Sequence, residues 1–155
     1  MKGEFIVNGE EKTFEFAPTD RLVDVLRRNG HTEVKKGCDE GECGACVILL
    51  DGVLVNSCQV LAGSAIGREI TTVKGIGSIH QPHPIQQALV EAGAVQCGFC
   101  TPGIVLAAYY LLSRNPDPTE DEIKEAISGN LCRCTGYVKI IEGIKLAAQR
   151  LKEQQ

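Results

Sequence analysis

The eight cysteines of this chain, which fall into two sets of four, constrain its structure more than any other feature of the sequence. The first set is Cys38, Cys43, Cys46 and Cys58, and the second set is Cys97, Cys100, Cys132 and Cys134. Together they account for every cysteine in the 155 residues. Cysteines grouped in fours are typical of iron–sulfur clusters and of structural zinc sites. The sequence therefore predicts two metal centres, one in each half of the chain.

The first set has the spacing C-x4-C-x2-C followed by a more distant cysteine, which is the plant-type pattern for a [2Fe–2S] cluster. Three of its ligands come from one loop, so the chain must wrap around the iron pair. Gly37, Gly41 and Gly44 alternate with these cysteines. Glycine permits positive φ and lets backbone N–H groups approach the sulfurs. The pattern therefore predicts an iron–sulfur cluster in the first half of the chain.

The second set consists of two close pairs, each of which comes just before a predicted helix. The free N–H groups and the positive dipole end of a helix N-terminus favour an anionic thiolate cluster. Zinc is the main alternative, because four-cysteine zinc sites also use C-x2-C pairs. The first set argues against zinc, since three ligands in one glycine-rich loop fit an iron–sulfur cluster better. Disulfides need an oxidising compartment, and the N-terminus shows no apolar signal segment.

Strand and turn signals dominate the first half of the chain. Asn8-Gly9 and Asp51-Gly52 each lie between two β-favouring segments, which is a strong hairpin signal. We expect strands at residues 4–7, 12–16, 45–50, 53–56 and 69–73. Thr19 or Asp20 is the expected N-cap of a helix through residues 22–26. This pattern predicts a β-grasp-like domain over residues 1–76.

Helical periodicity replaces the strands after a glycine- and proline-containing linker at residues 77–84. Apolar residues spaced three and four apart predict helices at residues 85–92, 104–114 and 137–151. A further helix is expected between Thr119 and Gly129, because Thr119 and Glu122 match a capping box. The predicted fold is therefore α+β, with a β-grasp domain followed by a four-helix domain over residues 85–155.

Three long motifs point to a known family. Residues 37–46 read GCDEGECGAC, residues 93–103 read GAVQCGFCTPG, and residues 129–137 read GNLCRCTGY. These motifs resemble those of the small iron–sulfur subunit of the molybdenum hydroxylases, the family of xanthine dehydrogenase and aldehyde oxidoreductase. The resemblance extends over about residues 4–150.

The resemblance implies a plant-type ferredoxin-like domain and a four-helix-bundle domain, each of which binds a [2Fe–2S] cluster through one cysteine set. It implies that Gln96 and Cys134 contact a molybdopterin held by a large partner subunit. The loop at Glu42 and Gly44 is then expected to face FAD on a medium partner subunit. Electrons would pass from the molybdopterin site through both clusters towards FAD.

Several function classes are excluded by composition and by missing motifs. The formal charge of −4 argues against binding to nucleic acid, which requires a basic face. No apolar run reaches the roughly 18 residues that a membrane span needs. With no signal segment either, we expect a cytoplasmic protein. No dinucleotide, P-loop or nucleophile motif is present, so the chain is expected to have no catalytic site of its own.

The substrate of such a complex is oxidised on another subunit, so the sequence of this chain says little about which substrate it is. Residues 41–46 resemble the purine (xanthine) and N-heterocycle members more than the carbon monoxide members. The alternative function is that of a free, soluble two-cluster ferredoxin that diffuses between its partners.

Overall fold

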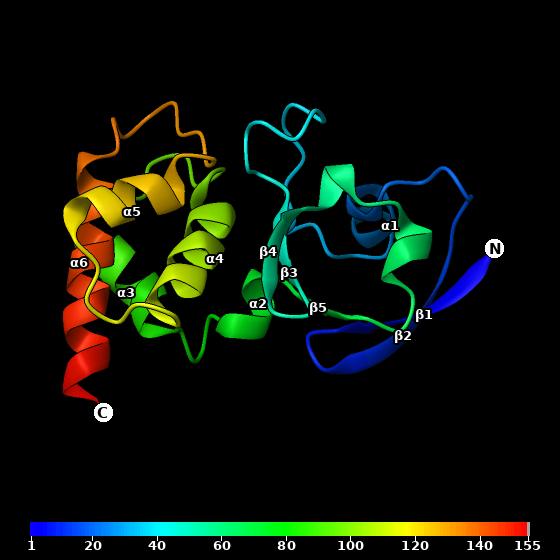
Figure 1. Ribbon diagram of the computed structural model, residues 1–155, viewed down its shortest axis with the longest axis horizontal. Helices are drawn as coiled ribbons and strands as arrows, with labels where there is room; N and C mark the ends of the chain where they lie inside the picture. Colours follow the sequence, from blue (N-terminus) through cyan, green and yellow to red (C-terminus); the bar gives the residue numbers. More distant parts are fainter. Residues whose placement is uncertain (155) are drawn as a thin grey trace.

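The computed structural model describes residues 1–154, which form two lobes side by side along the long axis of the molecule (Figure 1). The strands lie in the N-terminal lobe, and the C-terminal lobe is helical. This arrangement confirms the predicted α+β fold. In the part of the chain that the structure describes, no helix is both long and apolar enough to cross a membrane.

The N-terminal lobe is built on a mixed sheet of five strands in the order β2-β1-β5-β3-β4. Their bounds are β1 (Lys2–Val7), β2 (Glu10–Glu15), β3 (Val47–Leu50), β4 (Val53–Asn56) and β5 (Glu69–Thr71). Strands β1 and β5 are parallel, and the other neighbouring strands are antiparallel. Both predicted hairpin turns have positive φ at both central residues, with 52° and 81° at Asn8-Gly9 and 50° and 76° at Asp51-Gly52. These values confirm the hairpins and fit the twist of the strands.

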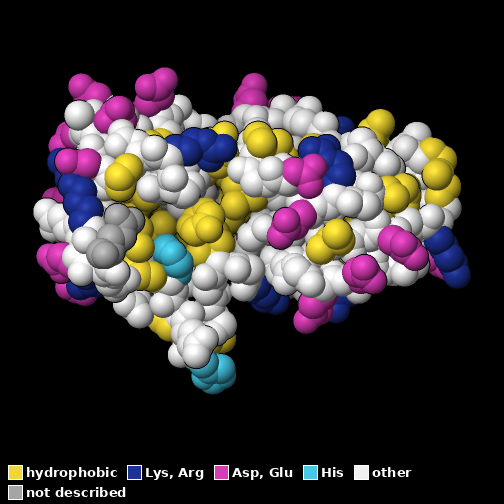
Figure 2. Space-filling model, turned by 60° about the horizontal axis from the view of Figure 1, so that its bottom comes forward, with side chains coloured by type: hydrophobic (Ala, Val, Ile, Leu, Met, Phe, Trp, Pro, Cys, Tyr) yellow, Lys and Arg dark blue, Asp and Glu magenta, His cyan; other side chains and the backbone are white. Residues whose placement is uncertain are grey.

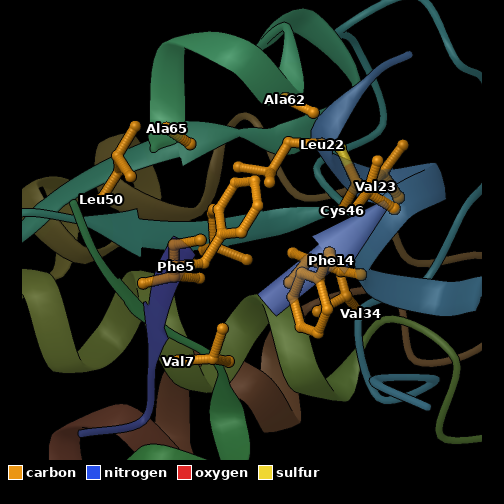
Figure 3. Close-up of a cluster of buried hydrophobic side chains, with 14 of the residues drawn as sticks. Phe5, Val7, Phe14, Leu22, Val23, Val34, Cys46, Leu50, Ala62 and Ala65 are labelled. Atoms are coloured by element: carbon orange, nitrogen blue, oxygen red, sulfur yellow. The ribbon is translucent and has the colours of Figure 1, made fainter. Parts of the chain in front are cut away.

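One face of this sheet is covered by helix α1 (Leu22–Arg28) and by two short 3₁₀ turns, Ser57–Gln59 and Ala62–Ala65. Figure 3 shows the side chains that meet there, with Phe5 at the centre and Phe14 and Leu22 beside it. Phe5 and Phe14 stack with their ring centroids 5.3 Å apart. Cys46 and Cys58 belong to the same apolar cluster, so two thiols of the first set are anchored in the core of this lobe.

The C-terminal lobe contains the four predicted helices, α3 (Pro84–Glu91), α4 (Thr101–Leu112), α5 (Glu120–Ile127) and α6 (Val138–Glu153). A short extra helix, α2 (Val73–Ile76), precedes them. The capping box at α5 is confirmed, because the side chain of Thr119 accepts from the amide of Glu122 and the Glu122 carboxylate accepts from the amide of Thr119. Apolar side chains from all four helices form a core separate from that of the first lobe.

The two lobes meet where helix α4 packs against strand β3. Val47 and Leu49 of the strand and Leu106 of the helix form a small buried cluster there. In the view of Figure 2, exposed hydrophobic side chains gather over the helical half and near this junction, while acidic and basic side chains are scattered. The division at residues 77–84 stays a prediction, supported by two cores that comprise residues 5–70 and 85–148. Residue 155, the end of the predicted second domain, lies outside the described residues.

His83 makes the start of helix α3 sensitive to pH. Its Nδ1 accepts from the amide of Ile85 at 3.2 Å, which requires an unprotonated ring nitrogen. Burial lowers the pKa of His83 from its ordinary value of 6.5. Because the pKa is lower in the folded state, this stabilisation is complete above pH 6.5 and is lost as the pH falls through the lowered value.

We therefore expect acidification below pH 6.5 to lower the urea midpoint more in the wild type than in His83→Ser, which keeps a capping hydroxyl that does not titrate. Urea unfolding at a series of pH values measures the difference. His80 lies in the same segment, and His80→Ser is the matched control, which should follow the wild type. Equal acid sensitivity in His83→Ser and the wild type would contradict this role.

Candidate metal centres

The first cysteine set is gathered by the loop that leads from helix α1 to strand β3. This loop carries Cys38, Cys43 and Cys46, and Cys58 follows from the 3₁₀ turn after strand β4. The amide of Cys43 donates to Sγ of Cys38 at 3.3 Å, and the amide of Cys38 donates to Sγ of Cys43 at 3.4 Å. Hydrogen bonds to its sulfur from the amides of Glu40 and Cys43 lower the pKa of Cys38 to about 7. Cys38 and Cys43 therefore form a pair linked by reciprocal amide–sulfur hydrogen bonds, and the thiolate form of Cys38 is favoured.

The other two thiols of this set form a second, buried pair. Cys46 and Cys58 are each only 2% exposed. Burial raises the pKa of Cys46 to about 11, and the neighbouring Cys58 thiol adds to the effect. A bound cation would reverse this, because coordination to a metal deprotonates a thiol outright. The structure thus brings the four cysteines together two by two, and their shared binding of one cluster stays a prediction.

Glycines shape the loop, although not for the same reason at all three positions. Gly41 and Gly44 have positive φ values of 85° and 67°. Gly37 instead leaves room for a thiol, since a Cβ there would lie 2.8 Å from Sγ of Cys43. Each of the three positions therefore requires glycine, for backbone conformation at two and for space at the third.

Two polar side chains that the cysteine pattern does not reveal also hold this loop. Nδ2 of Asn56 donates to the carbonyl of Gly41 at 2.8 Å, and Nε2 of Gln59 lies 3.4 Å from Sγ of Cys58. Nothing in the cysteine spacing identifies Asn56, because it reaches the loop across the β3–β4 hairpin. Gln59 was detectable only as the residue that directly follows the fourth cysteine.

In the second cysteine set the thiols influence each other's pKa in two pairs, Cys97 with Cys134 and Cys100 with Cys132. The thiol of Cys97 raises the pKa of its exposed partner Cys134, while the amide of Phe99 lowers the pKa of Cys97. Burial raises the pKa of Cys100 to about 12, and the adjacent Cys132 thiol contributes. The second set therefore has an exposed pair and a more buried pair.

Cys132 is held by residues of the turn that precedes helix α6. Burial alone would raise its pKa, but hydrogen bonds from the hydroxyl and amide of Thr135 outweigh burial and lower it to about 7. The hydroxyl of Tyr137 accepts from the amide of Cys132 at 2.8 Å. Tyr137 itself has a φ of 71°, in the left-handed region. The Thr135 hydrogen bonds to the Cys132 thiol therefore come from the turn before helix α6. The sequence predicted instead that such donors would be the free N–H groups in the first turns of helices.

The remaining predicted site residues differ in exposure. Gln96 and Glu42 are both at the surface, near the second and the first cysteine set respectively. Gly44 is buried against the helical lobe, where its neighbours are Gly129 and Asn130. A role of Gln96 towards a pterin and of the Glu42 loop towards a flavin stays a prediction.

The two cysteine sets lie on either side of a cavity of about 460 Å³. Its lining includes Cys38 and Cys43 from the first set and Cys97, Cys100 and Cys132 from the second. Among the described residues, no three His, Cys, Asp or Glu side chains converge on a position for a single metal ion. Thiols in pairs fit a two-iron cluster, because four cysteine thiolates serve two irons.

Each lobe matches a known domain family. Residues 5–68 match the 2Fe-2S iron-sulfur cluster binding domain, and residues 72–145 match the [2Fe-2S] binding domain. The fold and its paired cysteines therefore define a two-domain iron–sulfur protein.

Close relatives place the chain more narrowly. The nicotinate dehydrogenase small FeS subunit of Eubacterium barkeri is 50% identical over 145 residues, which is 93% of this chain and 92% of that protein. The xanthine dehydrogenase iron-sulfur-binding subunit of Escherichia coli O157:H7 is 43% identical over 143 residues, 91% of this chain and 90% of that protein. A chain of quinoline 2-oxidoreductase from Pseudomonas putida 86 superposes with a TM-score of 0.93 at 40% identity, covering 99% of this chain and 96% of that one.

This chain belongs to the family of small iron–sulfur subunits of the molybdenum hydroxylases. It is the electron-transfer subunit of an oxidoreductase complex, and its two domains each bind a [2Fe–2S] cluster.

Proposed function

We propose that this subunit connects a molybdopterin-binding large subunit with an FAD-binding medium subunit in an N-heterocycle dehydrogenase. When bound, the two [2Fe–2S] clusters would each accept and release single electrons, so that electrons pass from the molybdopterin site towards FAD. The observation that carries the proposal is the arrangement of the thiols, which form two paired sets in two domains joined by a buried interface.

The ligands that we propose follow the pairing of the thiols. In the first domain, Cys38 and Cys43 would hold one iron, while Cys46 and Cys58 hold the other. In the second domain the pairs would be Cys97 with Cys134 and Cys100 with Cys132. The backbone amides of Glu40 and Cys43 already donate to Sγ of Cys38 and would stabilise the negative charge of a bound cluster.

The exposed part of the second set is the proposed contact with the molybdopterin-binding subunit. Cys97, Cys134 and Gln96 are at the surface there, so a cofactor on another chain could reach them. Phe99 and Leu131 nearby are 46% and 58% exposed, which supports burial against a protein partner. Exposed Glu42 lies on the other cysteine loop, which we assign to the flavin side.

Nitrogen heterocycles are the proposed substrates of the complex. The names of the three relatives described above refer to nicotinate, xanthine and quinoline, all of which are nitrogen heteroaromatic compounds. Because the substrate would bind to the large subunit, this chain supports the class of substrate only through its similarity to these subunits. We also propose a cytoplasmic location, since cysteines that bind clusters must stay reduced.

The alternative is a free two-cluster carrier, and native purification separates the two functions. We expect the chain to co-purify with a flavin-containing and a molybdenum-containing chain, and with about four iron atoms and four acid-labile sulfides per copy. Elution alone, near 16.7 kDa, would support the carrier instead. Stoichiometric zinc without sulfide would contradict both functions.

A substitution of Gln96 tests the proposed pterin contact and leaves all proposed iron ligands unchanged. Its amide can donate and accept hydrogen bonds, which suits the polar edge of a pterin. We expect Gln96→Ala to keep both clusters but to weaken molybdenum-cofactor retention or slow reduction of the clusters by substrate. Metal analysis and rapid-mixing reduction of the assembled complex measure these effects.

Gln149→Ala, at an exposed position of helix α6, is the control and should behave as the wild type. Full molybdenum occupancy and unchanged reduction rates in Gln96→Ala would show that Gln96 only supports its local turn.

A further inference from the structure

Asn130 is a buried polar side chain that joins the two cysteine loops. It lies two residues before Cys132 in the helical domain and is only 4% exposed. Its Nδ2 crosses to the other domain and donates to the carbonyl of Gly44 at 3.1 Å. Gly44 lies between Cys43 and Ala45 in the first cysteine loop. One amide side chain therefore connects the loop of the first set with the loop of the second.

A second hydrogen bond runs beside this one. The amide of Leu131, the residue directly before Cys132, donates to the carbonyl of Cys43 at 2.9 Å. The residues Cys43-Gly44 and Asn130-Leu131 are thus joined by two adjacent bonds between domains. The first of these bonds comes from a side chain, and the second comes from the backbone.

The space around these bonds leaves little freedom. A Cβ on Gly44 would lie 2.1 Å from the carbonyl oxygen of Gly129, and a Cβ on Gly103 would lie 2.5 Å from the carbonyl oxygen of Gly44. Gly44 and Gly103 therefore let the backbones of the two domains approach closely. The side chain of Asn130 lies between these backbones. The backbone amide of Asn130 donates to the carbonyl of Ile127 at 2.9 Å, which fixes the position of the residue.

We propose that Asn130 is a positioning residue for electron transfer between the two clusters, an inference that rests on the cysteine ligands proposed above. By holding the carbonyl of Gly44, it keeps the Cys43 carbonyl against the Leu131 amide. That hydrogen bond then links a proposed ligand of the first cluster with the residue next to a proposed ligand of the second. Electron tunnelling weakens steeply with distance and is favoured along bonded paths, so this contact would set the coupling between the clusters.

A role in stability alone does not require this side chain. The apolar cluster of Val47, Leu49 and Leu106 already joins the domains. A buried amide adds little net stability even when it is hydrogen-bonded, but its bond has a direction that apolar contacts lack. The main effect of Asn130 is therefore to align the two cysteine loops, while the apolar cluster holds the domains together.

Two variants of the full chain in its complex test the proposal. Asn130→Asp keeps the shape but places a carboxylate oxygen opposite the Gly44 carbonyl, and Asn130→Ala removes the side chain. For both we expect two intact clusters, a weaker magnetic interaction between them when both are reduced, and slower exchange of electrons between them. We also expect the Leu131 amide to exchange with deuterium about tenfold faster, since its hydrogen bond is loosened.

Asn115→Asp is the matched control, because it makes the same chemical change in the helical domain at a local turn, where Oδ1 accepts from the amide of Asp117. It should leave the magnetic interaction and the Leu131 exchange as in the wild type. A folded Asn130→Asp variant with both clusters and an unchanged interaction would overturn the proposal. So would loss of the fold in both variants, which would make Asn130 purely structural. Loss of one cluster's own signal would also overturn the proposal, because Asn130 would then be needed for cluster binding and not for alignment; the ligands themselves are tested separately by the cysteine-to-serine variants.

Discussion

Replacing Cys43 by serine should remove the cluster of the N-terminal domain and leave the other cluster in place. The thiol of Cys43 lies within the reciprocal pair with Cys38, and an alcohol does not supply the thiolate that the iron needs. We expect the iron content to fall from about four to about two atoms per chain, with loss of one of two paramagnetic signals after reduction. Metal analysis and electron paramagnetic resonance measure both changes.

Cys100→Ser is the reciprocal experiment in the helical domain. It should remove the other signal and keep the one that Cys43→Ser loses, because the two sets belong to separate cores. Each variant therefore serves as the control for the other. If either variant lost both clusters while the rest of the chain stayed folded, the division into two sets of four would be wrong.

Gly44→Ala should strongly destabilise the chain although it changes no cysteine. Gly44 has a φ of 67°, and the added Cβ would meet the backbone oxygen of Gly129 at 2.1 Å. Left-handed backbone strain and overpacking together predict a loss of about 2–5 kcal/mol in the free energy of unfolding. Urea unfolding of the full chain measures this loss.

Gly52→Ala separates the two causes. Gly52 has a similar φ of 76°, but nothing lies within 4 Å of the added Cβ. It should therefore show only the backbone strain, about 1–2 kcal/mol. An equal loss in the two variants would mean that Gly44 is not enclosed by the helical domain.

Features that depend on neighbouring residues were predictable from the sequence. The turns at Asn8-Gly9 and Asp51-Gly52 need only two residues that tolerate positive φ, and the structure has both. The capping box of helix α5 needs only Thr119 and Glu122, three residues apart, and it is also present. Most of the cysteine spacing is also short, which is why the sequence alone divides the cysteines into two sets of four; the binding of one cluster by each set stays a prediction.

Features that depend on distant residues were not predictable. Thr19 or Asp20 was expected to cap helix α1, which was wrong: the N-cap is Arg21, without a side-chain cap. The amide of Leu22 bonds to the carbonyl of Val60 instead, so a tertiary contact replaces the local cap. Asn130 was missed in the same way, because its partner Gly44 is 86 residues away in sequence.

The position of strand β5 in the sheet determines when the first domain can close during protein synthesis. It lies between β1 and β3, so the sheet stays open until residues 69–71 have left the ribosome (Figure 1). All four thiols of the first set precede β5 and therefore emerge before their domain can close. Cys97 and Cys100 of the second set follow soon after β5, whereas Asn130, Cys132 and Cys134 follow only some 60 residues later. Domains of a nascent chain fold in order from the N-terminus. The first domain can therefore fold around its metal centre before all cysteines of the second set have been translated. The hydrogen bonds that join the two cysteine loops form last.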